Sequence, residues 1–395
     1  MEIVQRSPFS IVVFIAVITV VVGGIHYYLW SRLVRAPDLG PSFGRWGAWL
    51  FVALAALTPA GILLGRVLER PAAKVVAGVT YVWMGVAILL FFLLVSSEVV
   101  RAAIHAVAAL TSGSLDASRR AFVSRGIAGT AAVAALALAG VGAASALGQV
   151  AVRRVKVTLG RLPRSLSGFR VAQLSDLHIG PTLGAGWLAD VVARTNALDP
   201  DIVVITGDLV DGSVEELRAE VAPLGGLRAK HGVFFVTGNH EYYSGVDAWI
   251  EELGRLGVKV LRNERVSVGE GDESFDLAGV DDWSARSTLA RGHGADLARA
   301  VAGRDERREL VLLAHQPKQI HEAAERGVGL QLSGHTHGGQ IFPWGLFVRI
   351  DQPYVAGLAK HGETQIYVSR GTGFWGPPMR VAAPSEIALV ELMAA

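Results

Sequence analysis

The chain divides into two parts with different patterns of hydrophobic and polar positions. Up to about residue 150, long apolar runs contain few charges, and four runs reach the roughly 20 residues that a helix needs to cross a bilayer. We expect these spans at about residues 9–30, 46–65, 75–95 and 126–147. The fourth is rich in Ala and Gly, which insert only weakly, so a buried core helix is the alternative there. The pattern predicts an all-α transmembrane region of about four helices over residues 1–150.

Short β-rich runs alternate with helical segments in the second part. Strands are predicted at residues 171–174, 202–205, 233–236, 310–313 and 330–332, and a helix at 188–198. Strands that alternate with helices indicate an α/β domain, which we expect over residues 169–395. The basic, proline-containing segment before it, residues 151–168, is predicted to be a linker.

Each of these five strands ends in a polar cluster. The clusters are Asp176-x-His178, Gly207-Asp208-x-x-Asp211, Gly238-Asn239-His240-Glu241, His315 and Gly334-His335-x-His337. In α/β sheets ligands bind beyond the carboxyl ends of the strands, so the clusters are expected to converge. Residues two apart in extended backbone point to the same side, so Asp176 and His178 can hold one ion. His335 and His337 can face one ion or two neighbouring ions, and imidazole with carboxylate suits Zn, Mn or Fe.

Five such blocks in this order resemble the calcineurin-like metallophosphoesterase superfamily. The resemblance implies a β-sandwich flanked by helices and a site for two divalent metal ions. It implies that Asp176, His178 and His337 hold the first ion, that Asn239, His315 and His335 hold the second, and that Asp208 bridges both. In the same way, it implies that His240 binds no metal and instead stabilises the phosphoryl group or protonates the leaving oxygen.

Two acidic residues beside these blocks are candidates for supporting roles. Asp211 can orient His240 or a metal ligand, and Glu241 can contact the residues that bind the metal ions. A solvated loop carboxylate is the alternative for both. Two ions about 3.5–4 Å apart would clamp the attacking and leaving oxygens while a bridging water attacks phosphorus.

Ser333–Gln340 and Gly371–Gly373 are similar to a membrane-associated bacterial branch that includes lipid A-type pyrophosphatases and twin-arginine-exported phosphoesterases. Two substrate classes are open: a lipid-linked or nucleotide-linked phosphodiester or pyrophosphate at the membrane surface, and a general small phosphoester. The membrane anchor favours the first, because tethering raises the local concentration of substrate near lipid. A non-catalytic membrane sensor or scaffold is a further alternative.

The fourth apolar run is preceded by Ser118-Arg119-Arg120-Ala121-Phe122-Val123 and followed by Ala144-Ser145-Ala146. This arrangement resembles a twin-arginine export signal with a small-residue cleavage site, and an ordinary basic loop is the alternative. We therefore expect a multi-pass protein of the cell membrane with its catalytic domain on the extracytoplasmic side. Basic residues between the spans favour the same topology, although this excess disappears if Arg153, Arg154 and Lys156 are counted.

Composition and one further loop complete the sequence-based picture. A net charge of +2 predicts no nucleic-acid partner, and the absence of cysteine excludes disulfides and thiolate metal sites; the oligomeric state is left open. The loop Gly373–Arg380 follows a predicted strand at 365–369. Phe374 and Trp375 are candidates to meet a lipid or base and Arg380 to meet a phosphate, with a packed loop as the alternative.

Overall fold

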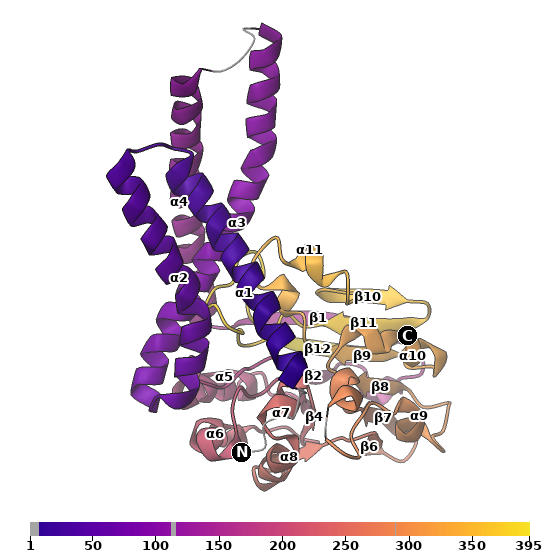
Figure 1. Cartoon of the computed structure of the whole chain (residues 1–395). Helices are drawn as coiled ribbons and strands as arrows, with labels where there is room; N and C mark the ends of the chain where they lie inside the picture. The colour runs from indigo at the N-terminus through magenta and orange to yellow at the C-terminus, as the bar shows by residue number, and fades with distance from the viewer. Residues whose placement is uncertain (1–7, 112–115, 289) are drawn as a thin grey trace. The chain divides into compact units, whose positions relative to one another are not determined.

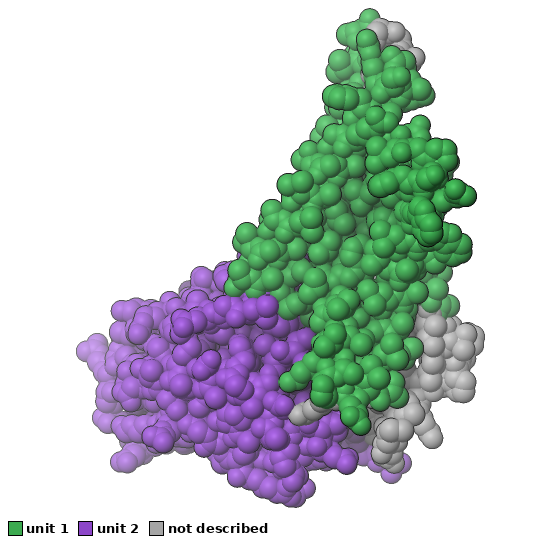
Figure 2. Space-filling model, turned by 90° about the vertical axis from the view of Figure 1, so that its left-hand side faces the viewer, with its two compact units in different colours: residues 1–144, 376–379 green, residues 145–375, 380–395 purple. Residues whose placement is uncertain are grey.

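The computed structural model describes the backbone of residues 8–111, 116–288 and 290–395, and their side chains except those of residues 8–15, 18, 66 and 70. The chain forms two compact units, shown in different colours in Figure 2. One comprises Met1–Ala144 with Gly376–Met379, and the other Ser145–Trp375 with Arg380–Ala395.

The first unit contains four long helices, α1 (Pro8–Trp30), α2 (Pro41–Val67), α3 (Arg70–Thr111) and α4 (Ala117–Leu147) (Figure 1). A π-helical turn, Ser31–Arg35, follows α1. Among the described residues, three segments are long and apolar enough to cross a membrane: Pro41–Gly65, Pro71–Thr111 and Ala117–Leu147. They contain the second, third and fourth predicted spans. The first predicted span lies in α1, where side chains 9–15 and 18 are outside the described part.

The second unit is built on two six-stranded sheets. The first has the order β1-β12-β2-β3-β4-β5, formed by β1 (Ala151–Leu159), β12 (Glu386–Ala394), β2 (Phe169–Leu174), β3 (Ile202–Thr206), β4 (Val233–Val236) and β5 (Val258–Val260). The second has the order β10-β11-β9-β8-β7-β6, formed by β10 (Gly357–His361), β11 (Thr364–Val368), β9 (Leu330–Ser333), β8 (Leu310–Leu313), β7 (Glu273–Gly279) and β6 (Glu264–Glu270). Strands β2 to β5 are parallel, as are β7, β8, β9 and β11.

The central strands β3 and β8 are almost entirely apolar because both of their faces are buried. In β3, Ile202 and Val204 enter the core between the sheets, whereas Val203 and Ile205 enter the core outside the first sheet. Alternate side chains of a strand point to opposite faces, so a continuous apolar run serves two cores.

Helices cover the outer faces of both sheets. Helices α5 (Ala185–Asn196), α6 (Val214–Val221) and α8 (Val246–Arg255) bury apolar side chains on the first sheet. Helices α9 (Leu297–Val301) and α10 (Ile320–Glu325) do the same on the second, and the short helices α7 (Asn239–Ser244) and α11 (Gly345–Val348) lie in loops. The predicted fold, a β-sandwich flanked by helices and preceded by a helical region, is confirmed.

The segment predicted as a linker is largely a strand. Residues 151–159 form β1, which pairs in parallel with β12 at the edge of the first sheet. Val157 and Leu159 enter the core between the sheets, while Arg154 and Lys156 face solvent near Glu391. Charged side chains are typical of an edge strand, where they discourage pairing with another chain. The basic residues that suggested a linker therefore mark an edge.

Candidate metal centre

The predicted site residues follow strands of both sheets. Asp176, Asp208 and Asn239 follow β2, β3 and β4, whereas His315 and His335 follow β8 and β9. Two hydrogen bonds connect the sheets here: His315 Nδ1 donates to the Thr206 carbonyl at 2.7 Å, and the His335 backbone N–H donates to Asp176 Oδ1 at 2.9 Å. Five segments that are distant in sequence thus meet where these strands end.

The backbone at these residues is left-handed rather than extended. Asp176, His178, Asp208, His335 and His337 have φ values of 53°, 47°, 51°, 71° and 51°. The reasoning from side-chain alternation in an extended strand is therefore wrong, although Asp176 and His178 do lie together. Asn239 and His240 likewise lie in the first turn of α7 rather than on a strand. Non-glycine residues in this region carry strain, which persists where the surroundings enforce it, often at functional sites.

Two glycines allow the strand ends to approach closely. A Cβ at Gly334 would collide with the side chains of Ser175 and Asp176, and one at Gly238 would collide with Asp208. Only glycine leaves room for the carboxylates at both positions.

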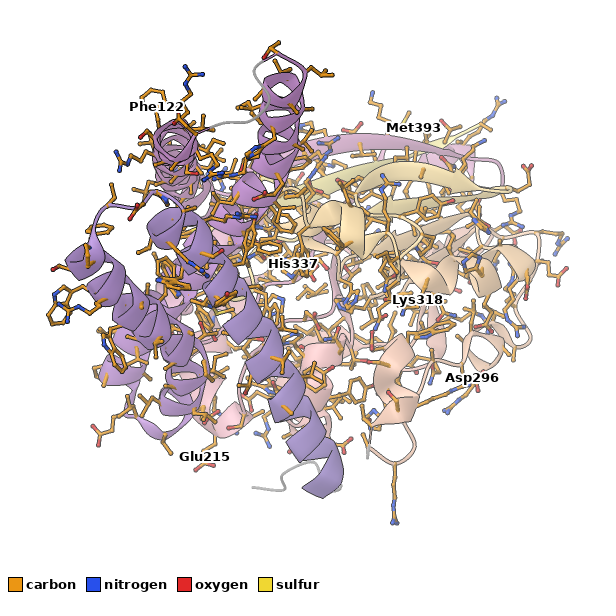
Figure 3. The ribbon with its side chains drawn as sticks, turned by 45° about the horizontal axis from the view of Figure 1, so that its top comes forward. Phe122, Glu215, Asp296, Lys318, His337 and Met393 are labelled. Atoms are coloured by element: carbon orange, nitrogen blue, oxygen red, sulfur yellow. The ribbon has the colours of Figure 1, made fainter. Side chains whose placement is uncertain are left out.

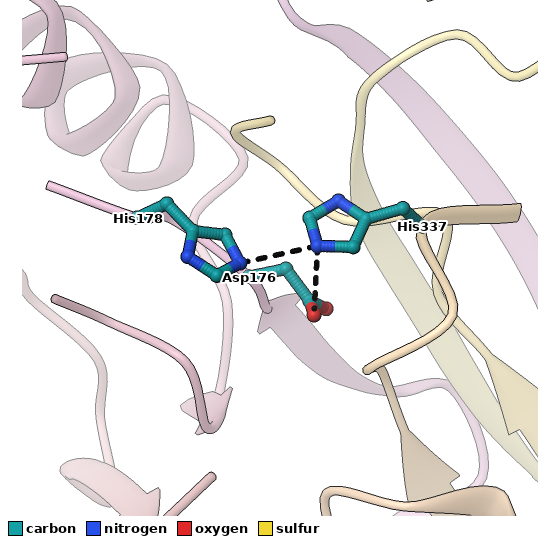
Figure 4. Close-up of side chains that lie close together, drawn as sticks. All are labelled: Asp176, His178 and His337. Atoms are coloured by element: carbon teal, nitrogen blue, oxygen red, sulfur yellow. Dashed lines mark hydrogen bonds and ion pairs between the residues drawn. The ribbon is translucent and has the colours of Figure 1, made fainter. Parts of the chain in front are cut away.

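Asp176, His178 and His337 form the first cluster, shown in Figure 4. His178 Nε2 lies 3.1 Å from His337 Nε2, which lies 3.5 Å from Asp176 Oδ1. All three residues are buried.

Asp208, His315 and His335 form the second cluster. Asp208 Oδ2 lies 3.1 Å from His315 Nε2, which lies 3.2 Å from His335 Nδ1. The same Asp208 Oδ2 lies 3.9 Å from His178 Nε2 of the first cluster. His335 and His337 therefore belong to different clusters, and one carboxylate oxygen lies near both.

The donor sets fit divalent ions. Two ligands on one ion at about 2.0–2.1 Å are themselves about 3.0–3.4 Å apart, which matches the nitrogen–nitrogen separations in both clusters. Asn239 Oδ1 is buried and accepts no hydrogen bond within the described part of the chain. A buried oxygen without a donor is unfavourable unless a cation contacts it.

One histidine of each cluster has a lowered pKa. Burial, reinforced by the charge of His315, lowers the pKa of His335 to about 3. Burial and then the Arg380 guanidinium lower the pKa of His337 well below its usual value. Both rings are therefore neutral at physiological pH, which is the state that can bind a metal ion.

His240 lies beside both clusters and contacts Asp211. Its Nδ1 is 2.6 Å from Asp211 Oδ1, and its backbone N–H donates to Asp208 Oδ1 at 2.9 Å. Burial opposes protonation of this ring, but Asp208 and Asp211 outweigh burial and raise the pKa of His240 to about 9. His240 also lies close enough to His178 and Asp208 to share a metal ion with them, so geometry alone does not exclude it as a ligand.

Asp211 connects His240 to the first cluster. Its Oδ1 also lies 3.0 Å from His178 Nδ1, so one carboxylate oxygen contacts two imidazoles. Burial would raise the pKa of Asp211, but His178 and His240 hold it below its usual value. The carboxylate therefore stays ionised, in contact with a candidate ligand and a candidate acid.

Glu241 is buried and organises the backbone. Its carboxylate accepts hydrogen bonds from the backbone N–H groups of Gly238, Leu209 and Asp208 at 2.6, 2.8 and 3.1 Å. Burial, reinforced by Asp208, raises the pKa of Glu241 to about 7. The alternative of a solvated loop carboxylate is therefore wrong for Glu241.

The loop predicted to contact substrate divides into buried and exposed residues. Arg380 is 1% exposed, and its Nη1 donates to the carbonyls of His337 and Arg370 at 2.9 and 2.6 Å. It is thus a packed side chain rather than an exposed phosphate contact, and Phe374 is buried as well. Trp375 is exposed, with its ring 5.6 Å from that of His240.

Sequence reasoning missed Tyr243. Its exposed ring lies 5.4 Å from the His240 ring. Residues three apart in a helix share a face, so the i,i+3 spacing from His240 in α7 was the available signal.

Two clusters of candidate metal ligands lie at the edge of a two-sheet sandwich. Comparison with known proteins identifies the family that shares these features. Residues 169–339 match the family model described as calcineurin-like phosphoesterase. A bovine transmembrane protein with metallophosphoesterase domain is 42% identical over 293 residues, which cover 72% of this chain and 65% of the relative. A metallophosphoesterase of Helicobacter pylori is 41% identical over 244 residues, covering 61% of this chain and 64% of the relative.

A shorter relative settles the family. A metallophosphoesterase of Aquifex aeolicus is 34% identical over 243 residues, which cover 61% of this chain and 91% of the relative. The chain belongs to the calcineurin-like metallophosphoesterase family. The chain spans less than two thirds of the length of the bovine and Helicobacter relatives. The bovine relative is named a transmembrane protein, and three helices among the described residues are apolar enough to cross a membrane, which together indicate membrane association.

Proposed function

We propose that the protein is a membrane-anchored phosphoester hydrolase with two divalent metal ions. Asp176, His178 and His337 would hold the first ion, Asn239, His315 and His335 the second, and Asp208 both. The observation that carries this proposal is the position of Asp208 Oδ2, 3.1 Å from His315 Nε2 and 3.9 Å from His178 Nε2. An oxygen between two ligand clusters is suited to bridge two ions.

The chain's own residues have distinct tasks in this proposal. When bound, the ions supply Lewis-acid activation of the phosphoryl group and of a water nucleophile. His240, protonated and held by Asp211, stabilises charge on the phosphoryl oxygens or donates its proton to the leaving oxygen. Asp211 keeps the His240 ring oriented through the 2.6 Å contact.

We place the substrate at a membrane surface, as a lipid-linked phosphodiester or pyrophosphate. Exposed Tyr243 and Trp375 border His240, and Gln340 exchanges two hydrogen bonds with the Trp375 backbone. The loop that begins at Gln340 continues with exposed apolar side chains: Phe342, Trp344, Leu346, Phe347 and Ile350. Aromatic and aliphatic groups beside a phosphate site favour a substrate with an apolar part.

The covalent link to the membrane helices supports the same substrate class. Gly148–Val150 alone separate the end of α4 from the start of β1. A link this short spans at most roughly 10–14 Å, so a membrane-inserted α4 would act as a short tether. Tethering raises the concentration of membrane-bound substrate at the site.

The proposed activity is tested with the full chain in detergent and bis-p-nitrophenyl phosphate. We expect Asp208→Asn and His240→Ala to abolish turnover, while exposed His321→Ala has no effect. Unchanged turnover in both site variants would refute the assignment.

A panel of a phospholipid, a nucleotide sugar and a small phosphomonoester then tests the substrate class; preference for the monoester would favour a general phosphoesterase.

We also propose that the catalytic domain faces outward and that Ser118–Val123 acts as a twin-arginine signal. The support is the sequence pattern, with Arg119 and Arg120 in the first turn of α4. Protease added to intact cells should cleave the domain, and Arg119→Lys with Arg120→Lys should protect it. Equal cleavage of both forms would remove the twin-arginine proposal.

A further inference from the structure

A cavity in the helical unit is lined by three arginines. Its volume is about 190 Å³, and it lies among the turn after α1 and helices α3 and α4. The polar side chains that line it are Arg32, Arg101, His105, Arg120 and Ser124. No acidic side chain lines the cavity in the described residues.

The positive charge around the cavity exceeds the negative charge. Glu98 is the nearby carboxylate: it pairs with Arg32 Nε at 2.9 Å, faces Arg101 Nε at 3.8 Å and accepts from the Tyr28 hydroxyl at 2.9 Å. One carboxylate thus opposes three guanidinium groups. This surplus of positive charge favours an anion.

Arg101 supplies unused donors. Its side chain is only 12% exposed, and Nη1 donates to Ser124 Oγ at 3.1 Å. Nη2 is buried and donates to no acceptor within the residues that the structure describes, and Nε makes no hydrogen bond there either. Buried guanidinium donors without acceptors are unfavourable, so an oxygen-rich ligand in the cavity would stabilise this arrangement.

We propose that this cavity binds a phosphate-bearing anion through Arg101 and Arg120. Guanidinium groups bind phosphate oxygens in paired hydrogen bonds, which suits a site with several arginines. The cavity is smaller than the roughly 300–1,000 Å³ typical of pockets for drug-sized ligands, so it fits a head group rather than a whole substrate. Basic pockets between membrane helices bind phospholipid head groups, and free phosphate offers the same chemistry.

This site gives Arg120, one of the two arginines near the start of α4, a role beyond an export signal. Arg120 lines the cavity, whereas Arg119 lies 3.5 Å from Asp116. Phe122, labelled in Figure 3, is 77% exposed and lies on the same helix. Successive residues of one motif therefore face different surroundings, and only Arg120 of the pair belongs to the site.

Binding is measured on the purified full chain in detergent, with Asp208→Asn present throughout so that the metal centre contributes little phosphate binding. The probes are dihexanoyl phosphatidic acid, inorganic phosphate and dihexanoyl phosphatidylcholine. We expect Arg101→Gln and Arg120→Gln each to weaken binding of the anionic probe at least about tenfold, because a charge-assisted contact is lost. Exposed Arg35→Gln removes the same charge from the neighbouring turn and should change binding less than about twofold.

The outcomes separate the proposal from general electrostatics and from misfolding. Unchanged binding in both cavity variants, or an equal loss in Arg35→Gln, would overturn it. Thermal unfolding of Arg101→Gln checks the fold, and Arg120 is exposed, so its variant remains decisive if Arg101→Gln unfolds. Tighter binding of phosphatidic acid than of phosphate identifies a lipid head group, and equal binding identifies free phosphate. None of these results bears on phosphoester hydrolysis.

Discussion

The two ligand clusters have similar donors but different support. In the first cluster, each histidine uses Nε2 toward the cluster, and its other ring nitrogen, Nδ1, contacts a charged side chain. His178 Nδ1 contacts Asp211, and His337 Nδ1 lies 3.2 Å from Arg380 Nη2. In the second cluster, His315 Nδ1 donates to a backbone carbonyl. A carboxylate behind a histidine strengthens it as a ligand, whereas a guanidinium weakens it. Side chains, which mutation can replace, therefore support the histidines of the first cluster, whereas a backbone carbonyl supports His315 in the second.

Replacement of Asp208, whose Oδ2 lies near both clusters, should impair metal binding at both clusters. We expect Asp208→Asn to lower bound metal from about two ions per chain to one or fewer, and turnover by about 10³-fold or more, because neither ion keeps its bridge. Metal content by mass spectrometry and hydrolysis of bis-p-nitrophenyl phosphate measure both effects. Exposed Asp272→Asn is the matched control. Two ions retained in Asp208→Asn would show that Asp208 does not bridge.

Single histidine variants, one in each cluster, should show that the two clusters bind their ions independently. His178→Ala is expected to leave the second ion bound and His315→Ala the first, with turnover lowered about 10²- to 10³-fold in each case. Titration with Mn²⁺, followed by electron paramagnetic resonance, counts the ions and detects coupling between them. Loss of both ions in either variant would mean that the clusters form one cooperative site.

Replacement of Arg380 should affect the first cluster and the stability of the domain. Its Nη1 holds the carbonyls of His337, Arg370 and Ala383. Arg380→Met leaves these buried acceptors unpaired, and we expect the free energy of unfolding to fall by roughly 2–4 kcal/mol. Denaturant unfolding measures this change, and metal titration should show tighter binding at the first site alone, because His337 loses the guanidinium that weakens it as a ligand. An equal change at both sites would contradict the separate support of the clusters.

Replacement of Asp211 should produce the smallest effect and a recognisable pH signature. Asp211→Asn removes a negative charge beside His240, so the pKa of His240 falls and its protonated form is lost at a lower pH. We expect the alkaline limb of the kcat profile to move down by about one pH unit, with turnover at neutral pH about tenfold lower. A lower rate with an unmoved limb would mean that Asp211 acts through His178 instead of His240.

The local chemistry of the site was predictable because it lies in short motifs after strands. The apolar runs at 202–205 and 310–313 identified buried strands, and the Asp, Asn and His residues that follow them come together in the structure. The backbone conformation was not predictable from alternation. The left-handed φ values at Asp176 and His178 depend on hydrogen bonds with the β3 loop, where the Asp176 and His178 N–H groups donate to the carbonyls of Gly207 and Asp208.

Residues outside the motifs show why the burial of individual side chains and the strand at residues 151–159 were not predictable from the sequence. In sequence, Arg380 follows an aromatic loop and was predicted as a candidate phosphate contact. In the structure it is buried, and its Nη1 donates to the backbone carbonyls of His337, Arg370 and Ala383. The charges of Arg154 and Lys156 suggested a linker, whereas pairing with β12 makes them an edge strand. Both outcomes depend on contacts with segments far away in the sequence.

The sequence alone determined the α/β class, the helical region and the set of residues that can bind metal, because these depend on local periodicity and on the chemistry of each side chain. The tertiary structure shows the division into two clusters that the family resemblance implies, and it decided which residues support each cluster and that a basic cavity forms among α3, α4 and the turn after α1. These properties arise from distances between residues up to about 160 positions apart, such as His178 and His337. No periodic pattern along the chain encodes such a distance.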